Sequence, residues 1–391
     1  MLRRILLIIF SLGWMSGISQ SAEQNKPFRY GYLQMFYHTG TTWSRTEYLS
    51  EAFKSGFRGG ELRLGFQSTG KRAWELFHNY PRYGVGISYS DLIISREDTT
   101  MSNPFSGFAF FGAPWARWGR TTLWSELSLG LSYTSLIHDP VQNPYNDVVA
   151  SHLNLYFNFS LNLGFILNKR IDLYAGGGLT HYSNGAIHRP QKGVNNWGAN
   201  LGMSYHFRFP GTGSEKSEEA GKTDVRPNLT YFKVEENMPR SELQIMTAAG
   251  IKEKQKLGEM DGYHYFTSSF TVDYAIPVSL KNRITFGLDF LYDGSLERAV
   301  TGVPPEDVTT FQKTYLGSHM GYQILIDRFT LLFNFGTYMV QHSYDRGFWY
   351  MRAGGRVRMT DWLHAHICIK TKAGIRADWI EWGLAYCIGT N

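Results

Sequence analysis

The feature that most constrains this chain is a strict alternation of apolar and polar residues, clearest over residues 151–165. A period of two places the two sets on opposite faces of a β-strand. The apolar odd positions are Leu153, Leu155, Phe157, Phe159, Leu161, Leu163 and Phe165, and the polar even positions include His152, Asn154, Asn158, Ser160 and Asn162. One such strand fits a soluble β-sandwich as well as a membrane barrel. Only the recurrence of the pattern in many segments favours the membrane barrel.

The alternation recurs over residues 123–133, 284–292, 329–335 and 363–369. About 9 to 11 residues of such a strand cross a bilayer. Short turns such as Asn168–Arg170 alternate with longer polar loops, as in outer-membrane proteins. We therefore predict an all-β fold, a transmembrane antiparallel β-barrel with an even strand number of about 12–16, sixteen being the central value.

The composition agrees with strands in a membrane. The 391 residues include 24 Tyr, 26 Phe, 11 Trp and 41 Gly, which suits a barrel with aromatic residues at the interfaces and glycines in curved strands. Past the N-terminal segment, no stretch approaches the roughly 18 uninterrupted apolar residues of a spanning helix. A bundle of membrane helices is excluded.

The N-terminus has the features of an export signal. Arg3 and Arg4 precede an apolar run that begins at Ile5, and Ser19, Ser21 and Ala22 provide a cleavage site of small residues. We expect residues 1–22 to be a cleaved signal peptide and residues 23–391 to form a single barrel in the bacterial outer membrane.

Two groups of strands flank a charged stretch between Gly211 and Asp224. About eight segments precede Phe207 and about eight follow Ser241. We interpret the charged stretch as a solvated loop of one barrel, with a linker between two domains as the alternative.

The net charge bears on the class of binding partner. A charge of +6 could suit nucleic acid, but export argues against nucleic acid and favours anionic lipopolysaccharide as the partner.

The two cysteines are predicted to be free thiols. Cys368 and Cys387 lack the spacing of zinc ligands.

Basic residues near the C-terminus share the predicted lumen face, with Glu381 as a partner. These residues are Arg352, Arg356, Arg358, His364, His366, Lys370 and Lys372. We interpret them either as members of ion pairs that fill the barrel interior or as groups that give a pore its selectivity. We predict no metal site and no cofactor.

A polar pair follows the glycine-rich segment at residues 176–178. His181 and Ser183 are two positions apart, so they lie on one face of a strand, the lipid side by parity with Leu173 and Leu179. An imidazole can activate a neighbouring serine as a nucleophile. Alternatively, the two side chains end the strand at the aqueous interface.

Residues 181–185, with the glycine-rich strand before them and the Arg189-Pro190 loop after them, resemble the motif of the lipid A 3-O-deacylase (PagL-like, acyloxyacyl hydrolase) family. The resemblance covers residues 143–207. It implies an outer-membrane barrel that hydrolyses an ester-linked acyl chain of lipid A in the outer leaflet, without a cofactor.

The resemblance also implies roles for single residues. His181 matches the general base and Ser183 the nucleophile, while Asn184, Gly185 and Ala186 match the oxyanion-binding region. Asn195 stands where the family has an acid, and Asp147 is a remote candidate for that role.

Parity and topology support this assignment. Asn195 shares the odd parity of the apolar face that begins at Trp197, whereas Asn196 faces the other way. The segment that ends in Ser183 is the seventh, so with a periplasmic N-terminus its end is extracellular.

His188, Arg189 and Lys192 follow in the next loop and could meet lipid A phosphates, or they could simply be solvated. The alternative for the whole protein is a non-catalytic barrel that serves as a pore, transporter or structural protein. The oligomeric state is not indicated.

Overall fold

A computed structural model describes residues 29–43, 56–93, 101–146, 148–190, 192–209, 224–229, 238–255, 262–298, 307–342, 347–373 and 376–389. The predicted signal peptide, Asp147 and most of the Gly211–Asp224 stretch lie outside these residues. No helix in the described ranges is long and apolar enough to cross a membrane.

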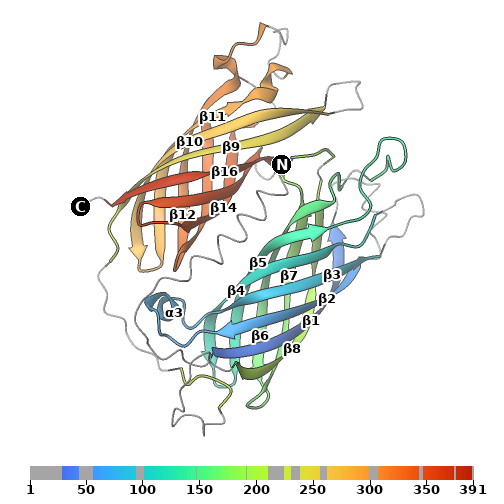
Figure 1. The fold of residues 1–391 in the computed structure, drawn as a ribbon, viewed down its shortest axis with the longest axis vertical. Coiled ribbons are helices and arrows are strands. Elements are labelled where there is room, and N and C mark those ends of the chain that lie inside the picture. The colour runs from blue at the N-terminus through green and yellow to red at the C-terminus, as the bar shows by residue number, and fades with distance from the viewer. Residues whose placement is uncertain are drawn as a thin grey trace.

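Within the described ranges, sixteen strands form two closed antiparallel barrels of eight strands each (Figure 1). The first contains β1 (Arg29–Trp43), β2 (Phe57–Gln67), β3 (Arg82–Leu92), β4 (Phe105–Trp118), β5 (Thr121–Tyr133), β6 (Leu153–Ile166), β7 (Ile171–Ser183) and β8 (Val194–Phe209). The second contains β9 (Glu242–Gln255), β10 (Gly262–Ser279), β11 (Asn282–Asp293), β12 (Thr314–Ile326), β13 (Phe329–Val340), β14 (Trp349–Arg358), β15 (Leu363–Lys372) and β16 (Arg376–Gly389).

The all-β antiparallel barrel fold is confirmed and the described residues form sixteen strands, but the expectation of a single barrel of 12–16 strands is wrong, because the strands close into two barrels of eight. β8 pairs back onto β1, from Arg29 opposite Phe209 to Trp43 opposite Asn195, and β16 pairs back onto β9. Eight strands enclose a space that side chains can fill. The wall therefore closes before the charged stretch, which connects two barrels.

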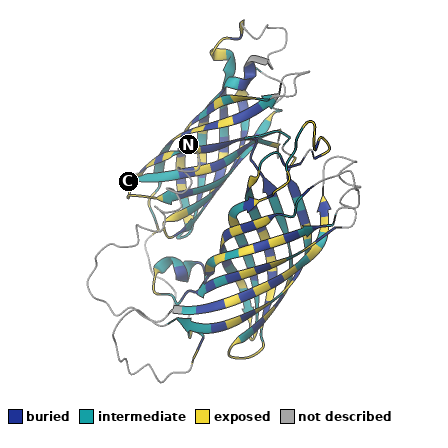
Figure 2. Ribbon diagram, turned by 45° about the vertical axis from the view of Figure 1, so that its right-hand side comes forward, coloured by how far each residue is buried: buried dark blue, intermediate teal, exposed yellow. Residues whose placement is uncertain are grey.

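Most strands have an exposed apolar face and a buried, largely polar face, as the alternation predicts (Figure 2). On β6, Leu161 and Leu163 are exposed while Ser160 and Asn162 are buried. The inward-facing residues of the first barrel include an ion-paired arginine, because Arg63 lies 2.6 Å from Glu61 through Nη2 and 3.3 Å from Glu126 through Nη1. Side chains, including charged ones, therefore occupy the interior.

Within each barrel, the connections also follow the predicted alternation, with one exception. Two residues join β4 to β5 and two join β10 to β11, on the end opposite the long loops. The exception is the β2–β3 connection, which carries the short helix α3 (Ala73–Phe77) at the short-turn end. In the described part of the β11–β12 connection lie the 3-10 helices η2 (Gly294–Arg298) and η4 (Phe311–Lys313).

The two barrels contact each other at the short-turn end. Arg72, just before α3, lies 3.2 Å from Asp327 in the β12–β13 turn. His78 Nε2 lies 2.7 Å from the carbonyl oxygen of Leu325. These contacts join the second hairpin of the first barrel to the second barrel.

Both cysteines are buried free thiols, as predicted. Cys368 on β15 stands opposite Glu381 on β16, and Cys387 lies further along β16. The hairpin therefore does not bring the two sulfurs together.

Candidate active site at the end of strand β7

The candidate nucleophile and base lie on the last residues of β7. In register with β6, Phe157 stands opposite His181 and Leu155 opposite Ser183. His181 is half-buried, and Ser183 is 9% exposed. Both belong to the outward-facing parity of β7, in which Leu173 is 40% exposed. The apolar residues of β6 border the pair on one side.

Strand β8 supplies the partner of His181. Asn195 is directly opposite His181 in the β7–β8 pairing, and its Oδ1 lies 2.7 Å from His181 Nδ1. An amide oxygen only accepts, so the Nδ1–H of the imidazole donates this hydrogen bond. The bond fixes the ring and assigns the proton to Nδ1, which leaves Nε2 as the basic nitrogen. Asn196 points inward and is buried, as its parity predicts.

Gly193 lies next to both candidate catalytic side chains. It has a φ of +66°, and a Cβ at this position would lie 2.9 Å from His181 Cε1 and 3.3 Å from Ser183 Cβ. The edge of the imidazole and the serine therefore border the same small space. Only glycine fits between them, because a methyl group would also lie 2.8 Å from the Tyr182 carbonyl oxygen.

The predicted oxyanion segment folds into a tight turn after Ser183. Asn184 Oδ1 accepts a hydrogen bond from the Ala186 N–H at 3.1 Å, and Asn184 Nδ2 donates one to the His188 carbonyl oxygen at 2.9 Å. Gly185 and Ala186 have φ values of +61° and +75°. The Ala186 amide is thus used within the turn, and among the described residues no acceptor faces the Gly185 N–H.

The second barrel covers this turn, a contact that the sequence did not indicate. The Glu253 N–H donates to the Ala186 carbonyl oxygen at 3.1 Å, and Arg189 Nε donates to the Glu253 carbonyl oxygen at 3.0 Å. A Cβ on Gly185 would lie 2.5 Å from Ile380 of β16. The candidate site therefore lies at the seam between the barrels, at the end with the long loops.

The loop residues expected to bind phosphates have different surroundings. His188 and Arg189 face Glu253 of the second barrel. The Lys192 residue is exposed overall, but partial desolvation of its ammonium group by the surrounding protein lowers the pKa of that group from its ordinary value. Their phosphate contacts stay a prediction, and Asp147 lies outside the described part of the chain.

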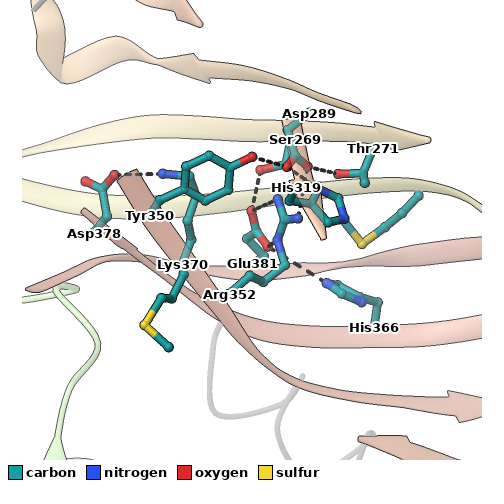
Figure 3. Close-up of polar contacts among 12 residues, drawn as sticks. Ser269, Thr271, Asp289, His319, Tyr350, Arg352, His366, Lys370, Asp378 and Glu381 are labelled. Atoms are coloured by element: carbon teal, nitrogen blue, oxygen red, sulfur yellow. Dashed lines mark hydrogen bonds and ion pairs between the residues drawn. The ribbon is translucent and has the colours of Figure 1, made fainter. Parts of the chain in front are cut away.

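The interior of the second barrel is filled by a buried polar network (Figure 3). Arg352 donates to Glu381 at 2.6 Å and to Asp289 at 2.9 Å, and Asp289 also lies 2.7 Å from His319. Lys370 Nζ lies 3.3 Å from Asp378. The interpretation of the C-terminal basic residues as interior ion pairs is confirmed for Arg352, Arg356 and Lys370, whereas Arg358 is exposed.

Two family models match the chain, one for each barrel. A model described as lipid A 3-O-deacylase (PagL) matches residues 58–204, and one described as acyloxyacyl hydrolase, C-terminal domain, matches residues 241–390. The first match begins at residue 58, well before residue 143, where the resemblance seen in the sequence begins. The second match covers the second barrel, for which the sequence motifs had indicated no family.

Similar solved structures are distant. The crystal structure of the outer membrane enzyme PagL is 16% identical, with a TM-score of 0.29, over 43% of this chain and 97% of that one. CdiB from Acinetobacter baumannii is 11% identical, with a TM-score of 0.18, over 93% of this chain and 60% of that one. The TodX monoaromatic hydrocarbon channel is 9% identical, with a TM-score of 0.18, over 93% of this chain and 90% of that one. No curated protein matches.

The two family models together span both barrels, and the His181, Ser183 and Asn195 positions fall inside the first of them. The chain belongs to the lipid A 3-O-deacylase (PagL) family of acyloxyacyl hydrolases.

Proposed function

We propose that this protein is an outer-membrane esterase that hydrolyses an ester-linked acyl chain of lipid A or lipopolysaccharide, with Ser183 as the nucleophile. The observation that carries the proposal is the 2.7 Å hydrogen bond from His181 Nδ1 to Asn195 Oδ1 beside Ser183. It lies within the residues matched by the deacylase model. An oriented imidazole next to a serine is the arrangement that nucleophilic acyl transfer requires.

The outer surfaces of the barrels support a membrane setting. Leu163 and Phe165 on β6 are 50% and 42% exposed, and Phe286 and Phe335 on the second barrel are 51% and 52% exposed. Contiguous apolar surface of this extent is stable against lipid and unfavourable against water. We infer that the signal peptide at residues 1–22 directs export and that the loop end with Ser183 faces the outer leaflet.

The mechanism follows from the proton positions. His181 Nε2 accepts the Ser183 hydroxyl proton as Oγ attacks the ester carbonyl, and the imidazolium then protonates the departing sugar oxygen. Water, deprotonated by the same nitrogen, attacks the acyl-serine carbonyl, and the fatty acid is released as the imidazolium returns the proton to Ser183 Oγ. Asn195 orients the ring but carries no charge to offset the imidazolium.

The developing oxyanion needs donors in the turn after Ser183. We assign the Gly185 N–H as the first donor, because the Ala186 amide is already bonded to Asn184 Oδ1. Asn184 acts by holding this turn. Its Nδ2 bonds the His188 carbonyl oxygen, so reaching the oxyanion would require that bond to break.

The exposed outer face beside the pair suits an acyl chain. Trp197 is 55% exposed and stands opposite Leu179, next to the His181–Asn195 pair. With Phe157 on β6, these residues line an apolar surface on both sides of the candidate base. Exposed Lys192 is the loop cation best placed to meet a lipid A phosphate from solvent.

The ion-paired interiors argue against the alternative of a water-filled pore. Arg63 in the first barrel and Arg352 in the second are each 1% exposed and bonded to carboxylates. An open pore keeps its lining in water, whereas these side chains are packed inside eight-stranded walls.

The test is acyl release from purified lipopolysaccharide in detergent, followed by mass spectrometry. Ser183→Ala and His181→Ala should each reduce the rate by about 10³-fold or more, and the double variant should be little worse, because the two act as a unit. Ser135→Ala, in an exposed loop, is the matched control. Undiminished release by folded Ser183→Ala would disprove the assignment of the nucleophile.

A further inference from the structure

Three potential metal ligands meet at the seam between the barrels. They are His188 from the loop after Ser183, Glu253 from β9 and His264 from β10. Each offers one ligand atom, and these atoms all lie within 4.8 Å of one another. None of them belongs to the His181, Ser183 and Asn195 group, and they come from both barrels.

The carboxylate of Glu253 is the centre of this cluster. Its side chain is 10% exposed, and Oε2 lies 3.3 Å from His188 Nδ1 and 3.8 Å from His264 Nε2. The two imidazoles are 45% and 46% exposed, so an ion could enter from solvent. Arg189 Nε donates to the Glu253 backbone carbonyl oxygen, while the Glu253 carboxylate contacts the two imidazoles.

The backbone around the cluster is held in place on both sides. The Glu253 N–H donates to the Ala186 carbonyl oxygen at 3.1 Å, and His264 Nε2 lies 3.1 Å from the Ile187 carbonyl oxygen. The ring centroids of His188 and His264 are 5.3 Å apart in an edge-on arrangement. The ligand side chains therefore start from a prearranged frame.

We propose that His188, Glu253 and His264 form a Zn²⁺ site that clamps the two barrels together. Two imidazoles and one carboxylate form a ligand set typical of zinc, with a fourth position for water. Ligand atoms bound tetrahedrally at about 2.0–2.1 Å lie roughly 3.3 Å apart. The Glu253–His188 spacing already has this value, whereas the Glu253–His264 spacing of 3.8 Å would have to shorten when the ion binds. Ca²⁺ and Mg²⁺ prefer all-oxygen sites and are disfavoured.

Zinc binding has a local cost and a structural consequence. His264 Nε2 would exchange its contact with the Ile187 carbonyl oxygen for the metal, or coordinate after a small rotation of the ring. In return the ion would tie the turn after Ser183 to β9 and β10. The site would thus stabilise the seam whether or not the protein hydrolyses esters.

The test uses the full chain without a polyhistidine tag, purified in detergent and treated with a chelator. Titration calorimetry with Zn²⁺ and visible absorption with Co²⁺ should show one ion per chain, and Zn²⁺ should raise the unfolding temperature. His188→Ala, His264→Ala and Glu253→Gln should each weaken Zn²⁺ binding by roughly tenfold or more. His342→Ala, in another loop at the same end of the second barrel, is the matched control and should bind as the parent does.

Heat-modifiable migration on gels checks that each variant is folded. A second measurement needs no variant: Zn²⁺ should protect His188 and His264, but not His342, from acylation by diethyl pyrocarbonate, read by mass spectrometry. Absence of saturable Zn²⁺ binding by the parent protein, or equal labelling of these histidines with and without Zn²⁺, would overturn the proposal. Unchanged affinity in all three folded ligand variants would also overturn it.

Discussion

At the scale of single residues, the candidate site depends on a glycine as much as on its reactive groups. His181 and Asn195 were predictable as neighbours, because their shared parity on consecutive strands places them on one face. Gly193 was not predictable, since its importance comes from a φ of +66° and from the closeness of His181 and Ser183. Neither property leaves a pattern in the sequence.

Replacing Gly193 by alanine should therefore impair the site and spare the barrel. The new methyl group would meet His181 Cε1 at 2.9 Å and displace the imidazole, so we expect acyl release to fall by about tenfold or more. Gly119→Ala is the matched control, because Gly119 has a φ of +57° in a turn and nothing within 4 Å of its added Cβ. Both variants should carry backbone strain of about 1–3 kcal/mol. Equal activity in the two would refute the close approach.

The amide at position 195 is the second residue-scale test. Asn195→Asp places a carboxylate oxygen at the same 2.7 Å from His181 Nδ1 and offsets the charge that forms on the imidazole, so kcat should rise. Asn195→Ala removes the orienting bond and should lower kcat, though less than loss of Ser183. Steady-state kinetics on lipopolysaccharide checks both, and the idea fails if Asn195→Asp is no more active than Asn195→Ala.

At the scale of strands, the alternation predicted most of what forms. Inward and outward faces followed directly from parity on β6, β11 and β13, because a strand places successive side chains on opposite sides. The ion-pair partners of the basic residues in the lumen of the second barrel were only partly predictable. Glu381 was expected to meet basic residues, but the role of Asp289 depends on the register of β11 with β12 and on its distance across the lumen from β14.

The lumen of the second barrel offers an element-scale prediction. Arg352 on β14 holds Asp289 on β11 and Glu381 on β16 together, and it is 1% exposed. Arg352→Met would leave two buried carboxylates without this partner and should destabilise the barrel by about 3–5 kcal/mol. Arg358→Met, on the exposed end of the same strand, should change little. Denaturant titration of the refolded proteins measures the difference, and equal midpoints would contradict the role assigned to Arg352.

At the scale of the whole molecule, the sequence could not separate one barrel of sixteen strands from two of eight. Every strand carries the same two-faced pattern, and only the pairing of β8 with β1 and of β16 with β9 decides where the wall closes. Such pairings join residues far apart in the chain. The same long-range arrangement brings Glu253 and His264 of the second barrel next to His188 of the first, a juxtaposition that the strand pattern does not predict.

Because all pairings of the first eight strands lie within residues 29–209, the first barrel should fold without the second. The fragment tested should run from residue 1 to residue 229, since Arg226 donates to Asp172 at 2.6 Å and helps close the short-turn end. We expect it to show heat-modifiable migration and β-dominated circular dichroism.

Acyl release by this fragment should be slower than that by the full chain, because the turn after Ser183 loses the Glu253 N–H bond and its packing against Ile380. A fragment that folds only when the second barrel is co-expressed would show that the barrels are one cooperative unit, and a folded fragment with full activity would show that the seam does not position the turn.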